Sequence, residues 1–222
     1  MMWDHQREET LRHALCEAGR HMCRHGLAVG SDGNVSARLD EHHILITPSG
    51  VNKGNMRPEH LLVVDLEGEV HRADGPARRP SSEMPMHLEV YRLRPDVGAV
   101  IHAHPPMAIA CTLAGISLAR PVLPEVIYHF GAIPTAPYAS PGTPEGAAAI
   151  RELIREHDAI LLDRHGSLTV GRDVAQALVR LEWVEHVAKI LLAAHACGPV
   201  DELPPEAVQR LQEQRRRAQG KG

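Results

Sequence analysis

Short apolar runs bounded by turn residues alternate with amphipathic helical stretches along most of this 222-residue chain. Residues 4–25 place apolar side chains at helical spacing and end at Gly26. The segments 99–104, 159–162 and 167–170 have the pattern of buried strands. This alternation leaves few architectures, because helices must cover a sheet if both sets of apolar side chains are to be buried. The sequence therefore predicts an α/β fold.

Length and composition favour one domain over residues 1–222. Hydrophobic residues make up 43% of the chain, which is enough for one well-formed core. Residues 120–139 have the composition of a Pro-rich loop and strand region, and residues 204–222 predict a last helix with a polar tail. No segment has the length and composition of a domain linker.

Composition also excludes several classes of function. A net charge of −4 and only two Trp, three Tyr and one Phe are a poor match for proteins that stack nucleic-acid bases. No apolar run approaches the roughly 20 residues that span a bilayer, and the polar first ten residues lack a signal-peptide pattern. The four cysteines form no CxxC pair, which is typical of reduced thiols. We therefore expect a cytoplasmic protein that binds neither nucleic acid nor membrane.

Histidine is abundant, with 16 in the chain, and two of them form the strongest local motif. His102 and His104 alternate in a predicted strand, so both side chains project from one face. Two such imidazoles can bind one cation, and His165, in a turn between two apolar strands, is the best candidate for a third ligand. The alternative is that these residues bind no metal, and that His102 and His104 are half-buried strand residues while His165 is a surface residue beside a glycine.

A second candidate feature is Glu83, which follows Ser81 and Ser82 at the start of a predicted helix. Helix N-termini favour anions, so these serines can bind a phosphate with Glu83 as a base beside it. In the simpler interpretation, Ser82 caps the helix and Glu83 complements its dipole.

Two glycine-bearing loops can complete an anion site. Gly33-Asn34 and Ser49-Gly50 both offer backbone N–H groups near strand ends, as phosphate-binding nests do. Most turns of this kind bind nothing, so neither loop decides the matter alone.

Taken together, these motifs resemble those of the class II aldolase/adducin family, which includes sugar-phosphate aldolases and 4-epimerases. The resemblance extends over about residues 8–198, and an SSE motif followed by HxH and a downstream HG is specific to it. The matching segments, in the family's order, are GNVSARL (33–39), ITPSG (46–50), PSSEMPMHLEVYRLRPDVGAVIHAHPPMAIA (80–110), APYASPGT (136–143) and ILLDRHGSLTVG (160–171).

The resemblance implies a fold, a metal and a site. The fold would be a three-layer α/β/α arrangement around a mostly antiparallel sheet, assembled as a homotetramer with active sites between subunits. His102, His104 and His165 would bind a divalent metal, usually zinc, and Glu83 would be the catalytic acid/base. The substrate phosphate would be bound by Gly33, Asn34, Ser49, Gly50, Ser81 and Ser82.

The implied reaction is cleavage of a ketose 1-phosphate to dihydroxyacetone phosphate and an aldehyde. A glutamate at position 83 resembles the aldolases, since the 4-epimerases carry an aspartate there. Tyr128 is the candidate proton donor, although its segment does not align cleanly with the family tyrosine. The expected substrate is L-fuculose 1-phosphate or, equally well, a 5-deoxy- or 5-methylthio-ribulose 1-phosphate.

Other functions remain open at this level. The same metal site serves epimerisation, dehydration or decarboxylation of a phosphorylated sugar. A non-catalytic, adducin-like assembly module would share the fold, but the intact histidines and Glu83 argue against it. A metallohydrolase is a weaker alternative, because no acid or imidazole follows His104 closely.

Overall fold

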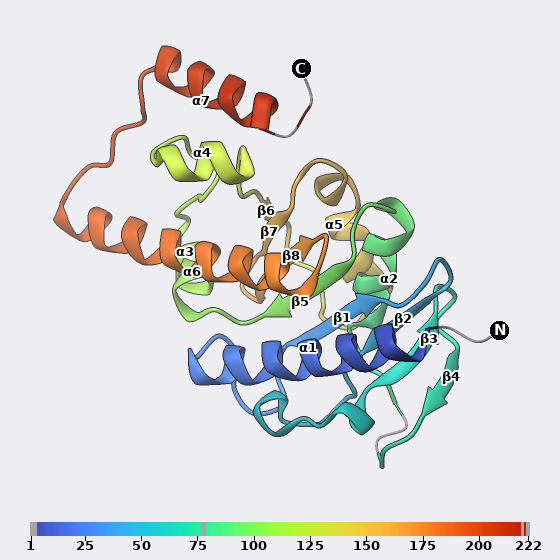
Figure 1. Cartoon of the computed structure of the whole chain (residues 1–222). Helices are drawn as coiled ribbons and strands as arrows, with labels where there is room; N and C mark the ends of the chain where they lie inside the picture. The colour runs from blue at the N-terminus through green and yellow to red at the C-terminus, as the bar shows by residue number, and fades with distance from the viewer. Residues whose placement is uncertain (1–3, 77–78, 219, 221–222) are drawn as a thin grey trace.

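The computed structural model of the chain describes residues 4–76, 79–218 and 220. Within them lie seven α-helices, two short 3₁₀ turns and one eight-stranded sheet (Figure 1). The elements are α1 His5–Arg24, β1 Asn34–Arg38, β2 His43–Ile46, η1 Lys53–Asn55, η2 Pro58–His60, β3 Leu62–Asp65, β4 Val70–Ala73, α2 Met84–Leu93, β5 Ala99–Ala103, α3 Pro106–Ala114, α4 Pro124–Phe130, β6 Thr135–Ala136, α5 Pro144–Glu156, β7 Ala159–Leu162, β8 Gly166–Gly171, α6 Val174–Cys197 and α7 Pro205–Ala218.

The sheet is almost entirely antiparallel. Its strand order is β4-β3-β2-β1-β5-β8-β7-β6, and only the short β6–β7 pair is parallel. The central position of β5 matters for the site, because β1 and β8 pair with β5 on its two sides. Three segments far apart in the sequence are thereby held next to one another.

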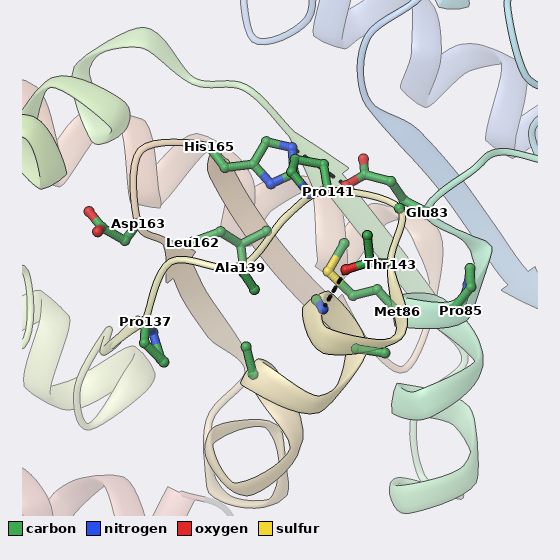
Figure 2. A pocket seen from close by; sticks show the side chains of 14 residues that line it. Glu83, Pro85, Met86, Pro137, Ala139, Pro141, Thr143, Leu162, Asp163 and His165 are labelled. Atoms are coloured by element: carbon green, nitrogen blue, oxygen red, sulfur yellow. Dashed lines mark hydrogen bonds and ion pairs between the residues drawn. The ribbon is translucent and has the colours of Figure 1, made fainter.

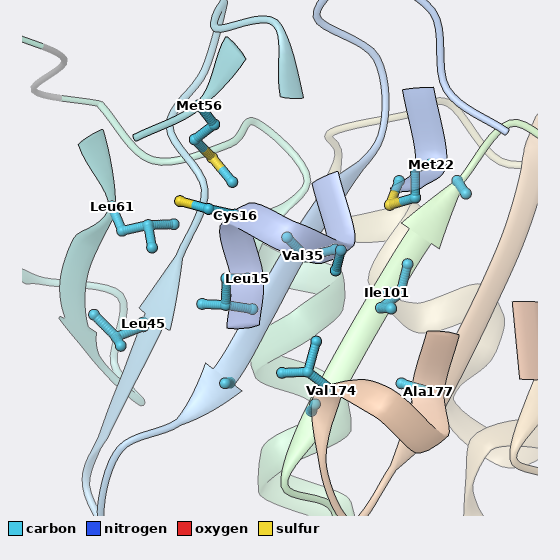
Figure 3. Packing of buried hydrophobic residues seen from close by; sticks show 14 of the residues in the cluster. Leu15, Cys16, Met22, Val35, Leu45, Met56, Leu61, Ile101, Val174 and Ala177 are labelled. Carbon is cyan, nitrogen blue, oxygen red and sulfur yellow. The ribbon is translucent and has the colours of Figure 1, made fainter. Parts of the chain in front are cut away.

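Helices cover both faces of the sheet. On one face α1 and α6 bury Leu15, Met22 and Ala177 against Val35 and Ile101 of the strands (Figure 3). On the other face α2 and α5 bury a second apolar cluster. A third cluster joins α3 and α4 to α6 and β7, and α7 lies beside α4 (Figure 1). The expected three-layer α/β/α fold with a mostly antiparallel sheet is confirmed.

Helix ends follow cap residues that the sequence displays. Asp173 accepts a hydrogen bond from the N–H of Gln176 at the start of α6. Thr143 does the same for Gly146 in α5. Gly115 ends α3 with a φ of 69°, a conformation that favours glycine.

The structure differs from the sequence prediction at residues 120–139. A helix, α4, occupies Pro124–Phe130, where a loop and strand region was expected. Pro124 is the first residue of that helix, a position where the missing N–H costs no hydrogen bond. The proline therefore marks a helix start here and not an irregular segment.

Two expectations about the chain's chemistry can also be compared with the structure. All four cysteines are free, as expected for reduced thiols. Among the helices of residues 4–218, none combines the length and apolar character needed to cross a bilayer.

Candidate active site

Three imidazoles and one carboxylate converge at the end of β5. One ligand atom from each of Glu83, His102, His104 and His165 lies within 4.8 Å of the others. The Nε2 atom of His102 is 3.0 Å from Nε2 of His104 and 2.8 Å from Oε2 of Glu83. The Nε2 atom of His165 is 3.5 Å from Oε1 of Glu83. The structure thus brings together all three predicted metal ligands and the predicted acid/base.

A glycine allows this convergence. Gly166 opens β8 directly after His165 and pairs closely with the end of β5. A Cβ atom at this position would collide with the carbonyl oxygen of Ala103 and lie 3.0 Å from Cδ2 of His104 and 3.2 Å from Cε1 of His102. The absence of a side chain therefore lets the turn that carries His165 approach the other two histidines.

Contacts of the Nδ1 atoms, on the side of each ring away from the cluster, orient His102 and His104. Nδ1 of His102 lies 2.9 Å from the carbonyl oxygen of Ser167, so Nδ1–H donates and Nε2 faces the cluster, where it donates a proton to Glu83 in the charged ring and offers a lone pair in the neutral ring. Nδ1 of His104 lies 3.5 Å from a carboxylate oxygen of Asp32. Two facing Nε2 lone pairs 3.0 Å apart would repel, so this pair needs either a proton on one ring or a metal ion bound by both. This donor set fits a divalent metal ion, with an outer carbonyl and carboxylate fixing the rings.

Burial keeps the rings of His104 and His165 neutral, which is the form of histidine that binds a metal. Desolvation, followed by the charge of His102, lowers the pKa of His165 to about 4. The same two causes lower the pKa of His104. Both side chains are therefore neutral near pH 7.

Glu83 is held as a carboxylate. Burial opposes its ionisation, but the hydrogen bond and charge of His102, together with a hydrogen bond from Asn34, lower its pKa to about 2. The amide Nδ2 of Asn34 donates to Oε2 of Glu83 at 3.2 Å. Glu83 is therefore ionised near neutral pH, which is the form that a general base requires.

A buried chain of hydrogen bonds, which we term the relay (Tyr91, Ser36, His87 and Asn34), ends on Glu83. The hydroxyl oxygen of Tyr91 lies 2.9 Å from Oγ of Ser36, which lies 2.6 Å from Nδ1 of His87. Nε2 of His87 lies 2.5 Å from Oδ1 of Asn34. Since Asn34 Oδ1 only accepts, His87 must donate from Nε2 and accept at Nδ1. Every donor in the relay therefore points toward Glu83.

His87 is not among the site residues predicted from the sequence. His87 is completely buried, and desolvation lowers its pKa to about 3, so it is neutral. A signal was present: Asn34 and Ser36 are polar residues at alternate positions, which share one face of a strand.

The six predicted phosphate-binding residues meet in one pocket beside Glu83 and His104, which we term the donor pocket. The N–H of Ser81 donates to the carbonyl oxygen of Thr47 at 3.0 Å, which joins two of its loops. The hydroxyls of Ser49 and Ser82 make no hydrogen bond to another described residue. The side chain of Asn34, in contrast, is engaged in the relay. The residues brought together are Gly33, Asn34, Ser49, Gly50, Ser81 and Ser82.

A second opening lies on the other side of Glu83. Figure 2 shows Glu83 and His165 pointing toward one another at its rim, with Pro141 and Leu162 on its walls. Most of the residues that line it are apolar, although Glu83, Asp163 and His165 also contribute. Glu83 thus lies between two pockets, one lined mainly by polar residues and the other by both polar and apolar residues.

Tyr128 is not part of this arrangement within one chain. It lies on α4, is 38% exposed and stacks edge-on against His129. Neither pocket is lined by Tyr128. Its role as proton donor therefore stays a prediction.

Comparison with known proteins agrees with this geometry. Residues 13–192 match the family described as Class II Aldolase and Adducin N-terminal domain. The chain belongs to this family. It is 34% identical to a 3-oxo-tetronate 4-phosphate decarboxylase of Cupriavidus necator, over 82% of this chain and 84% of that protein. It is 36% identical to an L-fuculose phosphate aldolase of Haemophilus influenzae, over 80% of each.

Solved structures show the same fold. YgbL of Escherichia coli superimposes with a TM-score of 0.83 and 31% identity, over 92% of this chain and 99% of that one. An L-fuculose-1-phosphate aldolase of Thermus thermophilus gives a TM-score of 0.73 and 32% identity, over 86% of this chain and 98% of that one. The relatives of the present chain thus include both aldolases and decarboxylases that act on phosphorylated substrates.

Proposed function

We propose that this chain is a metal-dependent lyase that breaks a carbon–carbon bond in a phosphorylated keto sugar and releases dihydroxyacetone phosphate. The observation that carries the proposal is the convergence of three imidazoles and the Glu83 carboxylate, beside the donor pocket. A carbonyl held at this point would lie next to both a metal site and a base.

The residues divide the work as follows. His102, His104 and His165 would hold a divalent ion, which we propose to be zinc. When bound, that ion supplies a Lewis acid for negative charge that develops on the substrate's carbonyl oxygen. Glu83 would carry the proton to and from the adjacent carbon. The donor pocket would bind the phosphate and so fix the carbonyl near Glu83.

Aldol cleavage is the leading reaction. The bond between C3 and C4 of a ketose 1-phosphate breaks, the C4 hydroxyl loses a proton to become an aldehyde, and Glu83, after taking up a proton from water, delivers it to C3. We propose L-fuculose 1-phosphate or a 5-deoxy- or 5-methylthio-ribulose 1-phosphate as substrate. Removal of the hydroxyl proton needs a further group, which we propose to be Tyr128 from a neighbouring subunit of a homotetramer. Tyr128 would accept this proton as the phenolate and donate it in the reverse, condensing direction.

Decarboxylation of a 3-oxo-tetronate 4-phosphate is the second candidate. Loss of carbon dioxide from this β-keto acid also leaves dihydroxyacetone phosphate after Glu83 protonates C2. Here no hydroxyl proton has to be removed, and among the described residues no tyrosine lines either pocket. The decarboxylases among the relatives support the same possibility.

A product assay separates these reactions. The zinc-loaded protein is incubated with ketose 1-phosphates and with 3-oxo-tetronate 4-phosphate, while dihydroxyacetone phosphate, aldehyde and carbon dioxide are measured. Glu83→Gln should lower the rate about 10²- to 10⁴-fold, the usual contribution of a general acid/base. If dihydroxyacetone phosphate forms from no substrate, the lyase proposal is wrong, and an epimerase, a dehydratase or an assembly module must be considered.

A further inference from the structure

One cationic side chain lies at the donor pocket, and no part of the proposed function has used it. Lys53 is one of three lysines in the chain and the only lysine or arginine among the described residues that line this pocket. Lys53 is only 1% exposed, although lysine is almost never fully buried without a partner. This combination calls for a reason.

Lys53 forms hydrogen bonds with both glycine-bearing loops of the pocket. Its Nζ donates to the carbonyl oxygen of Ser31 at 2.7 Å and to that of Val51 at 2.8 Å. Ser31 lies two residues before Gly33, and Val51 directly follows Gly50. The ammonium group has three donors, so one N–H is left for a further acceptor.

The backbone of Lys53 packs closely against α1. It opens η1, which packs against α1, and a Cβ atom on Gly19 of α1 would lie 2.7 Å from the Lys53 carbonyl oxygen. Lys53 thus packs against α1 through its backbone and hydrogen-bonds to both loops through its side chain.

The charge of Lys53 has no carboxylate ion pair among the described residues. Desolvation lowers its pKa to about 8, and the groups that counter this effect are Cys23 on α1 and Asp32 in the first loop. A buried cation of this kind is costly unless an anion compensates it. A phosphate dianion in the donor pocket would do so.

We propose that Lys53 is the cation with which the donor pocket binds the substrate phosphate, so that it selects phosphorylated over unphosphorylated keto compounds. This inference rests on the proposed function and adds a specificity residue to it. Neutral hydroxyls and N–H groups supply direction to the phosphate oxygens, whereas Lys53 supplies charge from beneath the loops.

The test compares metal-loaded wild type with Lys53→Met, which keeps the length of the side chain, and Lys53→Arg, which keeps its charge. Lys189→Met, on an exposed part of α6, is the matched control. Binding of inorganic phosphate and of dihydroxyacetone phosphate should weaken about 10- to 100-fold in Lys53→Met, the loss expected for one charged hydrogen bond. Lys53→Arg should recover most of this loss, and Lys189→Met should bind as the wild type does.

Two further measurements distinguish a charge from a merely structural role. Metal content and inhibition by unphosphorylated dihydroxyacetone should not change in Lys53→Met. In the wild type, phosphate affinity should fall as the pH rises through about 8, because Lys53 then loses its proton while phosphate stays a dianion. Lys53→Arg should show no such fall. This last comparison remains decisive if Lys53→Met does not fold.

The inference is overturned if Lys53→Met binds phosphate within about twofold of the wild type, or if the wild-type affinity is flat across that pH range. These outcomes are distinct from failure of the lyase proposal. Phosphate binding that depends on Lys53 without any lyase activity would contradict only the proposed function.

Discussion

Gly166 is the residue on which the geometry of the histidine cluster most directly depends. Replacing it by alanine would force the β8 strand away from Ala103 and the two histidines of the β5 end. We expect Gly166→Ala to lose about 1–3 kcal/mol of stability from overpacking. Metal affinity should fall at least about 10-fold, since displaced ligands and their supports commonly cost that much. Metal content after dialysis and a urea titration measure the two effects.

Gly146→Ala in α5 is the control for that variant. Its Cβ atom would have one near neighbour, the Ser140 carbonyl oxygen at 3.3 Å, and alanine favours a helix. It should retain metal as the wild type does. Full metal retention in Gly166→Ala would show that the close approach at Gly166 is not needed.

His87 offers a test of the relay behind Glu83. In His87→Phe, Ser36 and Asn34 lose their buried partner, and the Asn34 amide is no longer fixed on Glu83. We expect kcat to fall about 10-fold with little change in KM, because positioning and not binding is lost. The acidic limb of the pH–rate profile should move to higher pH, since the carboxylate loses a hydrogen bond that favours it.

Tyr91→Phe and His87→Gln provide the comparison for His87→Phe. Tyr91→Phe removes only the far end of the relay, so its effect on kcat should be smaller, while His87→Gln keeps a donor and should recover part of the rate. A His87→Phe variant that is less stable but has unchanged kcat and pH profile would reduce the relay to a purely structural role.

At the scale of single elements, the start of α3 depends on a side chain from α6. The N-cap of α3, Pro105, makes no side-chain cap. Instead the carboxylate of Glu185 accepts from the N–H groups of Met107 at 3.0 Å and Ala108 at 3.1 Å. We expect Glu185→Gln to lose about 1 kcal/mol and Glu185→Leu about 2–3 kcal/mol of unfolding free energy, because the second leaves these N–H groups unsatisfied.

Urea denaturation of both variants measures this difference, and Glu182→Gln, on an exposed part of α6, is the control. Because α3 begins two residues after His104, Glu185→Leu should also weaken metal binding. Equal stability of the Gln and Leu variants would mean that the carboxylate does not cap α3.

The elements that sequence could predict are those whose signals are local. Asp173 and Thr143 mark helix starts by their own hydrogen-bonding capacity, and Gly115 marks an end by its backbone freedom. The helix Pro124–Phe130 was not predicted because proline is compatible with both a loop and a first helical turn. Seven residues are also too few to show a helical period clearly.

At the scale of the whole molecule, the convergence of His102, His104, His165 and Glu83 could be predicted from their motifs, whereas the residues around them could not. Asn34 lies opposite His102 only because β1 pairs with β5 in that register, and no local pattern specifies the register. Lys53 was missed for a similar reason, since its hydrogen bonds to Ser31 and Val51 depend on the packing of η1 against α1. That the chain forms a single domain stays a prediction.

The last prediction concerns assembly. Tyr128 lies on α4, outside both pockets of its own chain, so its proposed role requires a neighbouring subunit. Glu83→Gln and Tyr128→Phe should each be nearly inactive alone. In an oligomer whose sites combine Glu83 of one subunit with Tyr128 of the next, random mixing of the two variants restores both residues in about a quarter of the sites. Activity of co-refolded mixtures, with a sizing column for the assembly state, measures this. Mixtures that stay inactive while the oligomer forms would remove Tyr128 from the site, and the decarboxylase, which needs no such group, would become the leading reaction.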